Sequence, residues 1–432
     1  MAGALLPPRT RAAAALTRTV NAVSRRMGVG SGTVVGGRAG LAVDRRLLSR
    51  LASGRPVALV TGTNGKTTTT RLLSVAVADL GPVVTNATGS NMPEGHVAAL
   101  VAGPPGATAV LEADEGYVPG LVADLTPRVV VLLNLSRDQL DRTSEVRILA
   151  GRWREALGRV PATTVVANAD DPLVAWGAGT AERVIWVGAG LGWRLDAVGC
   201  PACEGRIDFA PDGWSCACGF ARPPLDVWVG REGGGAEARF AEARFADGRR
   251  VPVALAIPGR FNQANATLAA AAAEVLGVPA GRALGRMAAV EEVAGRFAVR
   301  AVAGVPTRVM LAKNPAGWSE LLDLVCPGAG PVVVGINARV ADGRDPSWLW
   351  DVPFERLRGR PVVATGERCR DLAVCLRYAE VAHTTLPDPV AAVRSVAGRP
   401  DPADAGTILA GASPEVDFIG NYTAFHDLLG RR

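Results

Sequence analysis

Hydrophobic residues occur along most of the chain as short β-branched runs that alternate with longer stretches rich in Ala, Leu and Arg. In the first half of the chain, each run is followed by a loop rich in Gly, Asn or Asp. These runs are Pro56–Val60, Thr108–Leu111, Val129–Leu133, Thr164–Ala167 and Val184–Val187. Such alternation is typical of βαβ units, so the pattern predicts an α/β fold with a parallel sheet.

The alternation stops in 195–225, a segment rich in Cys, Gly and Pro that has no helical periodicity. Beyond it, 236–257 has β-like character, and a helix is predicted from about Asn262 to Leu276, ended by Gly277. The alternation then resumes, which predicts a second α/β domain of Rossmann-like type. The runs that predict it are Thr307–Leu311, Pro331–Ile336, Pro361–Thr365 and Thr407–Leu409.

The composition narrows the class of protein. The chain has 432 residues, of which 48% are hydrophobic and 20% charged, values typical of a globular protein with two or three domains. The longest apolar runs, such as Leu268–Ala273, are too short to cross a bilayer, so we expect no transmembrane segment. A net charge of +6 without a dense basic stripe argues against a nucleic-acid partner.

The N-terminal segment is basic. Arginines precede the first acidic residue, Asp44, and Arg18 interrupts the apolar stretch Ala12–Val20, which makes a secretory leader a poor interpretation. The arginines are Arg9, Arg11, Arg18, Arg25, Arg26 and Arg38. Two interpretations stay open, an amphipathic helix that touches anionic membrane and an ordinary surface helix. We expect a cytoplasmic protein, with peripheral contact to the inner face of the membrane under the first interpretation.

Lysine is rare in this chain. Of the 47 basic residues only Lys66 and Lys313 are lysines. Arg and Lys serve equally well on a solvated surface, but they are not equivalent where a compact ammonium must fit among phosphates or reach a small anion. Both lysines are therefore candidates for chemistry.

Residues 56–70, PVALVTGTNGKTTTT, predict a phosphate-binding loop between a strand and a helix. Glycines allow backbone amides to approach phosphate oxygens, Lys66 can reach the β- and γ-phosphates, and the Thr67 hydroxyl can bind Mg²⁺. The first Gly of the general pattern falls at Val60, so the loop is a variant. The candidate nucleotide-binding residues are Gly62, Thr63, Asn64, Gly65, Lys66, Thr67 and Thr68.

Four of the seven cysteines lie close together in the sequence. Cys200 and Cys203 make a C-x₂-C pair, and Cys216 and Cys218 make a C-x-C pair after a hairpin-sized spacer. Four thiolates in two close pairs predict a zinc ribbon over about 196–225, against the alternative of a disulfide or redox pair. The ribbon would hold together an insertion too small to fold alone. The other cysteines, Cys326, Cys369 and Cys375, are expected to have no catalytic role.

The sequence TGTNGKTT resembles the Mur ligases and folylpolyglutamate synthetases, ATP-dependent enzymes that phosphorylate a carboxylate and let an amine attack the acyl phosphate. The resemblance implies that Glu112 in AVLEADE holds Mg²⁺ and that Ser90 adds a further ligand. It also implies that Asn262, in GRFNQANATLAAAA, binds adenine. Arg296 and Arg344 are further nucleotide-binding candidates under the same resemblance.

Two departures from the family concern its metal. Gln139 stands where most members have a Mg²⁺-ligating His, in a segment that includes Asn134, Asp138 and Asp141. Many Mur ligases carry a carbamylated lysine near the metal. Lys66 belongs to the phosphate loop and Lys313 lies in the other domain, so neither lysine of this chain can take that role. The resemblance therefore places the Mg²⁺ on Thr67, Glu112 and Ser90, with water or Gln139 filling in.

The cysteine cluster and the C-terminal segments narrow the resemblance to the MurT family. The segments are LAKNPAGW, ADGRDPSWLWDVPFE, TGERCRDLAVCLRYA and GNYTAF. The family implies amidation of the D-glutamate α-carboxylate of lipid II to D-isoglutamine, with ammonia from a GatD-type glutaminase. The resemblance divides the chain into a lead-in segment 1–55, an ATP-binding domain 56–299 and a C-terminal domain 300–432.

Two roles in the C-terminal domain follow from this resemblance. Lys313 would contact an acyl phosphate or a substrate carboxylate at the end of a strand. Asp351, with Asp342 and Asp345 as alternatives, would complete the catalytic triad of the partner glutaminase. No Cys of this chain lies in a nucleophile-elbow sequence, so the chain is expected to lack a glutaminase of its own.

Two other functions remain as hypotheses. One is a free-standing ligase that adds an amino acid to a peptide or folate, which would act without a partner subunit. The other is a nucleotide-dependent regulatory or nucleic-acid-binding protein, which would bind RNA or DNA in a salt-sensitive way.

Overall fold

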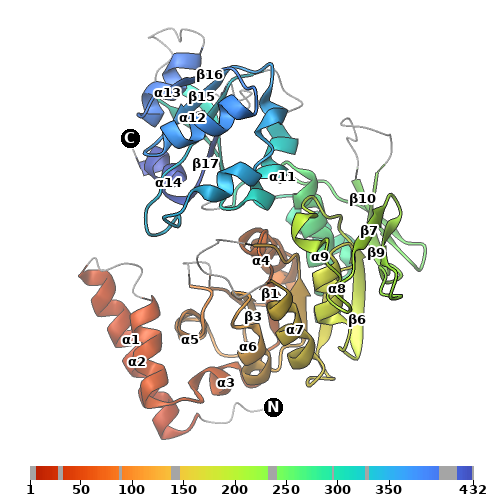
Figure 1. Ribbon diagram of the computed structural model, residues 1–432. Helices are drawn as coiled ribbons and strands as arrows, with labels where there is room; N and C mark the ends of the chain where they lie inside the picture. The colour runs from red at the N-terminus through yellow and green to blue at the C-terminus, as the bar shows by residue number, and fades with distance from the viewer. Residues whose placement is uncertain are drawn as a thin grey trace. The chain divides into compact units, whose positions relative to one another are not determined.

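The computed structural model describes residues 6–27, 33–86, 90–137, 146–231, 241–293, 296–325, 330–397 and 416–430. Contacts divide the chain into two compact units (Figure 1). Unit 1 contains 1–136, 144–256 and 261–290, and unit 2 contains 137–143, 257–260 and 291–432. The N-terminal segment packs within unit 1.

Unit 1 is built on a nine-stranded sheet with the order β11-β10-β9-β6-β5-β4-β1-β3-β2. The strands from β2 to β9 in this order run parallel, and β10 and β11 add an antiparallel edge. The bounds are β1 Val57–Thr61, β2 Val83–Val84, β3 Thr108–Glu112, β4 Val129–Leu132, β5 Thr164–Asn168, β6 Arg183–Gly188, β9 Val227–Arg231, β10 Ala241–Phe245 and β11 Arg250–Pro252.

The centre of this sheet positions the phosphate loop. Every residue of β1 and β4 is buried, as expected for strands covered by helices on both faces. The chain passes from β1 through β2 to β3 on one side of β1, and then to β4 on the other side. The order of the strands therefore reverses at β1, and loops at the carboxyl ends of β1, β3 and β4 meet there. Open α/β sheets bind ligands at such a switch point.

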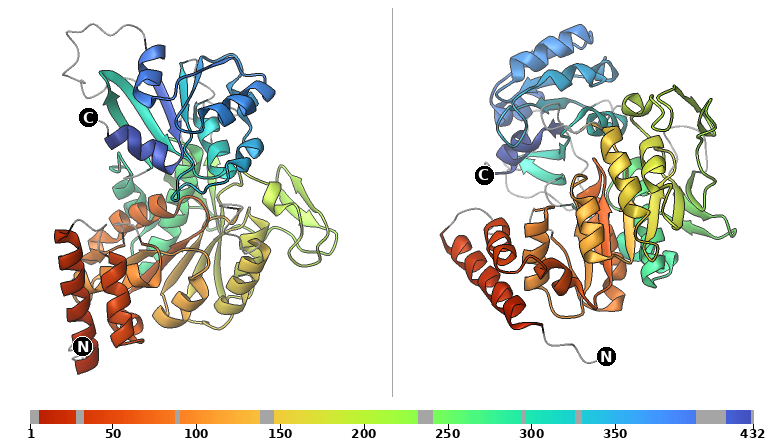
Figure 2. Two further views of the ribbon diagram at one scale, coloured as in Figure 1. Left: turned by 60° about the vertical axis from the view of Figure 1, so that its left-hand side comes forward. Right: turned by 60° about the horizontal axis from the view of Figure 1, so that its bottom comes forward.

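Helices cover both faces of the sheet. Their bounds are α1 Pro8–Arg26, α2 Thr33–Val43, α3 Leu47–Ala52, α4 Lys66–Ala76, α5 Pro93–Ala102, α6 Val118–Leu125, α7 Val146–Leu157, α8 Pro172–Ala178, α9 Arg260–Leu276 and α10 Ala280–Met287, with short 3₁₀ turns η1 Val77–Leu80 and η2 Leu195–Ala197. α1 and α2 lie side by side at the edge of the unit (Figure 2). A separate hairpin, β7 Ile207–Ala210 and β8 Gly213–Cys216, carries part of the cysteine cluster.

Unit 2 has a six-stranded sheet with the order β12-β13-β17-β14-β15-β16. β12 and β13 form an antiparallel hairpin, and the other neighbours are parallel. The strands are β12 Phe297–Val302, β13 Val305–Leu311, β14 Val332–Gly335, β15 Val362–Thr365, β16 His383–Thr385 and β17 Val416–Gly420. The helices are α11 Pro315–Val325, η3 Ser347–Asp351, η4 Phe354–Leu357, α12 Cys369–Tyr378, α13 Pro389–Val396 and α14 Tyr422–Gly430.

Most of the predicted elements are confirmed, including all five strands of the first half and the helix that Gly277 ends. The run Thr407–Leu409 lies outside the described residues. The sequence interpretation missed β17, a central strand of unit 2, together with β12 and β16. Among the described residues, no helix is both long and apolar enough to cross a membrane.

Candidate nucleotide and ligase site

The phosphate loop joins β1 to α4 through two glycines with positive φ. Gly62 has φ +140° and Gly65 has φ +85°, conformations that other residues adopt only with strain. A Cβ at Gly62 would lie 2.9 Å from the backbone nitrogen of Asn134, so this position also lacks room for a side chain. The loop therefore requires glycine at both positions, as the sequence pattern predicts.

The loop is fastened to the segment that follows β4. The Asn64 N–H donates to the Asn134 Oδ1 at 2.8 Å, and the Asn134 Nδ2 donates to the Asn64 carbonyl at 3.0 Å. The Thr63 hydroxyl donates to the Ser136 carbonyl and accepts from the Ser136 N–H, both at 2.9 Å. Thr63 and Asn64 thus hold the loop in shape, which keeps its backbone amides arranged before a ligand arrives.

The Lys66 ammonium is buried at the first residue of α4. Its Nζ donates to the Gly62 carbonyl at 2.6 Å and the Thr63 carbonyl at 3.2 Å, and it lies 3.1 Å from the Glu115 Oε1. The side chains of Lys66 and Glu115 are only 9% and 13% exposed, so solvent screens this pair weakly. Sequence reasoning missed Glu115, although it lies in the same AVLEADE segment as Glu112.

Glu112 ends β3 beside the loop, as predicted. The Thr67 hydroxyl donates to the Glu112 Oε2 at 2.9 Å, which brings the two predicted Mg²⁺ ligands together. Asn86 exchanges two hydrogen bonds of 2.8 Å with the Glu112 backbone, and the His96 Nε2 lies 2.7 Å from the Glu112 carbonyl. Burial lowers the pKa of His96, so this imidazole stays neutral and donates to the carbonyl.

Ser90 lies near the same acidic group. The Asn86 side chain donates both to the Ser90 carbonyl and to the Glu112 carbonyl. The Ser90 hydroxyl is buried and has no hydrogen-bond partner among the residues that the structure describes. The Thr67 hydroxyl and the Glu112 carboxylate, which contact each other, are oxygen donors of the kind that Mg²⁺ takes, and the buried Ser90 hydroxyl is a further donor left without a partner among the described residues. The residues present therefore fit a bound Mg²⁺.

The start of α9 lies against the phosphate loop. A Cβ at Gly65 would lie 2.9 Å from the Asn265 Oδ1, so this amide touches the loop directly. Asn262, the predicted adenine-binding residue, is buried one turn earlier on the same helix. Thr68 is buried within α4. Asn265 is a second residue that sequence reasoning did not select.

The four clustered cysteines converge. Their Sγ atoms all lie within 4.8 Å of one another, with 3.8 Å between Cys200 and Cys218 and 3.5 Å between Cys203 and Cys216. Four sulfurs around a zinc ion with bonds of about 2.3 Å lie about 3.8 Å apart in a tetrahedron. The four sulfurs therefore lie close enough together to hold one metal ion.

The cysteine hairpin is docked on the end of β5. The Trp214 Nε1 donates to the Ala169 carbonyl at 3.0 Å, and Arg222 forms an ion pair of 2.8 Å with Asp170. Phe220 packs against Trp214 with 4.9 Å between ring centroids. Ala169 and Asp170 directly follow β5, so these contacts tie the hairpin to the sheet of unit 1.

Lys313 lies at the carboxyl edge of the sheet in unit 2. β13 pairs with β17 so that Leu311 faces Gly420, which places Lys313 and Tyr422 at neighbouring strand ends. The Lys313 Nζ lies 4.9 Å from the centroid of the Tyr422 ring. Burial, together with the charges of Lys313 and Arg296, lowers the pKa of His426 on α14. Arg296 and Lys313, both predicted, thus lie close enough to act on His426, against the opposite effect of Asp427.

The three candidate aspartates of unit 2 differ in their environments. Asp342 is buried, and it accepts hydrogen bonds from the N–H and the hydroxyl of Thr423 at the start of α14. Asp345 accepts from the N–H and hydroxyl of Ser347 within its own turn. Asp351, at the end of η3, is 41% exposed and lies 3.8 Å from Arg137. Asp342 therefore has a structural task, and Asp351 is open to a partner.

Other predicted residues are exposed or lie outside the description. Arg344 is exposed in the loop before η3. Asp138, Gln139 and Asp141 lie outside the described residues, so their relation to Glu112 stays a prediction.

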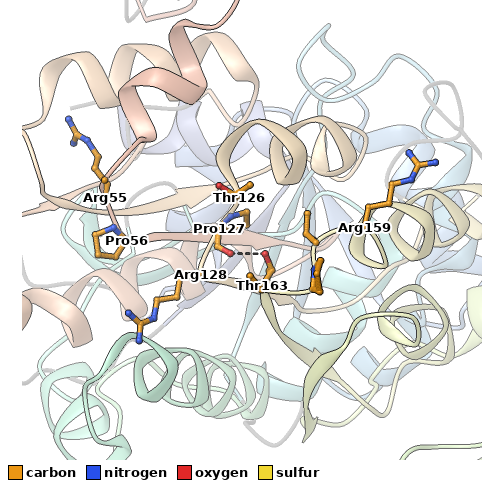
Figure 3. A pocket seen from close by; sticks show the side chains of 11 residues that line it. Arg55, Pro56, Thr126, Pro127, Arg128, Arg159 and Thr163 are labelled. Atoms are coloured by element: carbon orange, nitrogen blue, oxygen red, sulfur yellow. Dashed lines mark hydrogen bonds between the residues drawn. The ribbon is translucent and has the colours of Figure 1, made fainter. Parts of the chain in front are cut away.

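A cavity of about 590 Å³ lies at the amino ends of the strands in unit 1, whereas the phosphate loop lies at their carboxyl ends (Figure 3). Its lining includes Pro127 and Thr163, at the amino ends of β4 and β5, and the arginines Arg55, Arg128 and Arg159. The three guanidinium groups point in different directions in Figure 3, and each bonds a carbonyl or a carboxylate elsewhere. The cavity is therefore separate from the phosphate loop and has no converging charges for an anion.

Two protein-family models match separate parts of this chain. Residues 60–191 match the model described as the Mur ligase middle domain, and residues 311–425 match that of the MurT ligase C-terminal domain. The MurT subunit of lipid II isoglutaminyl synthase from Streptococcus pneumoniae is 29% identical over 376 residues, 81% of this chain and 83% of that protein. The subunit from Staphylococcus aureus is 28% identical over 389 residues, 85% of this chain and 87% of that protein.

The chain combines a Mur ligase middle domain with a MurT ligase C-terminal domain. It is thus an ATP-dependent ligase. Solved structures agree on this fold. A pseudomurein peptide ligase type C from Methanothermus fervidus has a TM-score of 0.62 at 20% identity, covering 87% of this chain and 79% of that one. MurF from Acinetobacter baumannii has a TM-score of 0.61 at 16% identity, covering 91% and 80%.

Proposed function

We propose that this chain is the synthetase subunit of a peptidoglycan-precursor amidoligase, which converts the D-glutamate α-carboxylate of the lipid II stem peptide into the carboxamide of D-isoglutamine. The observation that carries the proposal is the joining, in one chain, of a Mur ligase nucleotide site to a MurT C-terminal domain. The names of the relatives that match most of the chain supply the substrate.

The phosphate loop provides the means of activating the carboxylate. Its backbone N–H groups and the Lys66 ammonium bind the phosphates of ATP, and the oxygens of Thr67, Glu112 and Ser90 hold Mg²⁺. The bound Mg²⁺ would neutralise charge on the transferring phosphoryl group. A substrate carboxylate oxygen attacks the γ-phosphorus and ADP leaves, so the product is an acyl phosphate. The protein supplies positioning and positive charge rather than a nucleophile.

The second step forms the amide. The lone pair of ammonia forms a bond to the acyl carbon, the bond from that carbon to the phosphate oxygen breaks, and the nitrogen loses one proton as inorganic phosphate departs. The Lys313 ammonium lies at the carboxyl edge of the unit 2 sheet, so we assign it to the acyl phosphate and its carboxylate precursor, while Arg296 keeps its assignment to the nucleotide. Arg344 remains assigned to an ATP phosphate.

Ammonia would come from a glutaminase subunit of GatD type. The S. pneumoniae and S. aureus relatives are named as glutamine-hydrolysing synthase subunits, and the described cysteines of this chain other than the cluster, Cys369 and Cys375, are both buried. Asp351 is exposed and adjoins Trp350, whose ring packs against that of Tyr378 at 5.5 Å between centroids. The exposed fractions of Trp350 and Tyr378 are 56% and 76%, which supports a protein partner that covers them and reaches Asp351.

The converging cysteines Cys200, Cys203, Cys216 and Cys218 would hold a structural Zn²⁺. Their hairpin buries few apolar side chains of its own, so metal ligation would supply the stability that its small core lacks.

The experiment incubates the chain with lipid II, MgATP and either glutamine or ammonium, with and without the glutaminase, and measures conversion of one carboxyl to a carboxamide by mass spectrometry. We expect ammonium alone to support the reaction and glutamine to require the partner. Lys66→Ala should abolish both reactions. Asp351→Asn should abolish only the glutamine reaction, with Asp345→Asn as the matched control.

Two results would contradict the proposal. Wild-type amidation by Lys66→Ala would remove the ATP site from the mechanism. Incorporation of a free amino acid without any partner subunit would instead favour the free-standing ligase.

A further inference from the structure

We propose that the exposed face of α1 is a contact surface for an anionic lipid bilayer. α1 carries Arg9, Arg11, Arg18, Arg25 and Arg26 and no acidic residue, and the chain has no acidic residue before Asp44. This proposal rests on the surface of α1 and does not depend on the amidation reaction.

One face of α1 is already occupied. Thr10, Ala13, Ala14, Thr17 and Asn21 are buried, and the helix packs against α2 with further contacts to α5 and α3. α1 is the outermost helix at its edge of unit 1 in both views of Figure 2. The opposite face of the helix is therefore free to meet a surface outside the unit.

The exposed face has two rows of side chains, which follow from the pitch of about 3.6 residues per turn. Arg11, Arg18 and Arg25 repeat every seven residues, so they form one row along the helix. Leu16, Val23 and Met27 form a second row and are 38%, 49% and 71% exposed.

Between the two rows the helix presents mostly small residues. These are Ala12, Ala15, Thr19 and Ala22, with Arg26 in the last turn, all exposed. Small side chains let the helix approach a surface closely, with the apolar row on one side and the basic row on the other. Val35, 54% exposed at the start of the neighbouring α2, adds apolar surface near the end of α1.

This combination fits lipid better than nucleic acid. Anionic headgroups attract arginine side chains, which extend along the interface while the apolar row enters the boundary with the acyl chains. A nucleic acid would use the arginines but would leave Leu16, Val23 and Met27 facing water. The helix would lie in the plane of the membrane along its 19 residues, a length of about 28 Å.

The test measures sedimentation of the full chain with vesicles, in the absence of ATP and substrate. We expect binding to vesicles of phosphatidylcholine mixed with phosphatidylglycerol and little binding to phosphatidylcholine alone. Each arginine near an anionic surface strengthens binding about fivefold, so Arg11→Gln, Arg18→Gln and Arg25→Gln together should weaken it roughly a hundredfold.

Two further variants separate the alternatives. Replacing Leu16, Val23 and Met27 by Ser leaves the charge unchanged and should also reduce binding, which a purely electrostatic or nucleic-acid surface would not show. The triple Arg→Gln change at the exposed Arg152, Arg159 and Arg183 removes the same charge elsewhere on unit 1 and should leave binding unchanged. Thermal unfolding checks that every variant is folded.

The proposal is overturned if the wild-type chain does not bind anionic vesicles, if the control triple weakens binding as much as the α1 triple, or if an RNA or DNA duplex displaces the vesicles. Because the assay contains neither ATP nor lipid II, its failure leaves the amidation assay unaffected. A chain that binds vesicles but does not amidate lipid II would refute the proposed function alone.

Discussion

Asn134 offers a direct test of the idea that the phosphate loop is held ready for nucleotide. Its side chain makes two hydrogen bonds, of 2.8 and 3.0 Å, to the N–H and the carbonyl of Asn64. Asn134→Ala removes both and leaves the main chain of Asn64 without these partners. At about 1 kcal/mol for each bond, the loop loses about 2 kcal/mol of preorganisation, which corresponds to roughly thirtyfold weaker MgATP binding.

The assay is isothermal titration of the chain with a non-hydrolysable ATP analogue and Mg²⁺. Asn168→Ala is a matched control, because Asn168 also makes two side-chain hydrogen bonds, each of 3.0 Å, at the end of the neighbouring strand β5. It should destabilise the fold to a similar extent in urea while leaving nucleotide affinity within a factor of about three. Wild-type affinity in Asn134→Ala, or equal losses in both variants, would refute the reasoning.

Three further predictions concern pH, backbone strain and metal. Burial lowers the pKa of His96 below its unfolded value, so its contribution to stability is present above the unfolded pKa and is lost as pH falls through the folded pKa. His96→Gln should therefore flatten the decline of unfolding free energy that begins as pH falls below about 6.5. Gly65→Ala should lower the free energy of unfolding in urea by more than Gly54→Ala does. Both changes place Ala at a positive φ, which costs about 1–2 kcal/mol, but of the two only Gly65 has a neighbour within 4 Å of the added Cβ. Equal losses would contradict the packing of Asn265 on the loop. Cys203→Ser should lower the zinc content measured by mass spectrometry below one ion per chain, whereas Cys375→Ser should not; a wild-type chain purified without zinc would contradict the site.

The sequence predicted the phosphate loop because its chemistry is local. Gly62, Gly65, Lys66 and Thr67 lie within six residues, so spacing alone specifies their arrangement. Glu115 was missed because its role depends on the turn after β3, where the Tyr117 N–H donates to the Asp114 carbonyl and the chain folds back toward the ammonium of Lys66. No periodicity in the sequence distinguishes this carboxylate from a solvated one.

The strand β17 was missed for a different physical reason. Its sequence, VDFIG, has a carboxylate within a short apolar run, which weakens the pattern of a buried strand. In the structure, Asp417 is buried and forms an ion pair of 2.7 Å with Arg308 on the neighbouring strand. The partner lies 109 residues away in sequence, so compensation of this charge could not be foreseen from the local pattern.

The contacts of the Lys66 ammonium have a consequence for the protein before ATP binds. Because two carbonyls and Glu115 already satisfy this charge, the buried Lys66 ammonium does not depend on a phosphate to compensate it. Nucleotide arrival then amounts to an exchange of partners for one side chain rather than the creation of a site. We therefore expect the ligase to keep its phosphate loop folded when ATP is scarce and to bind ATP without first rebuilding that loop.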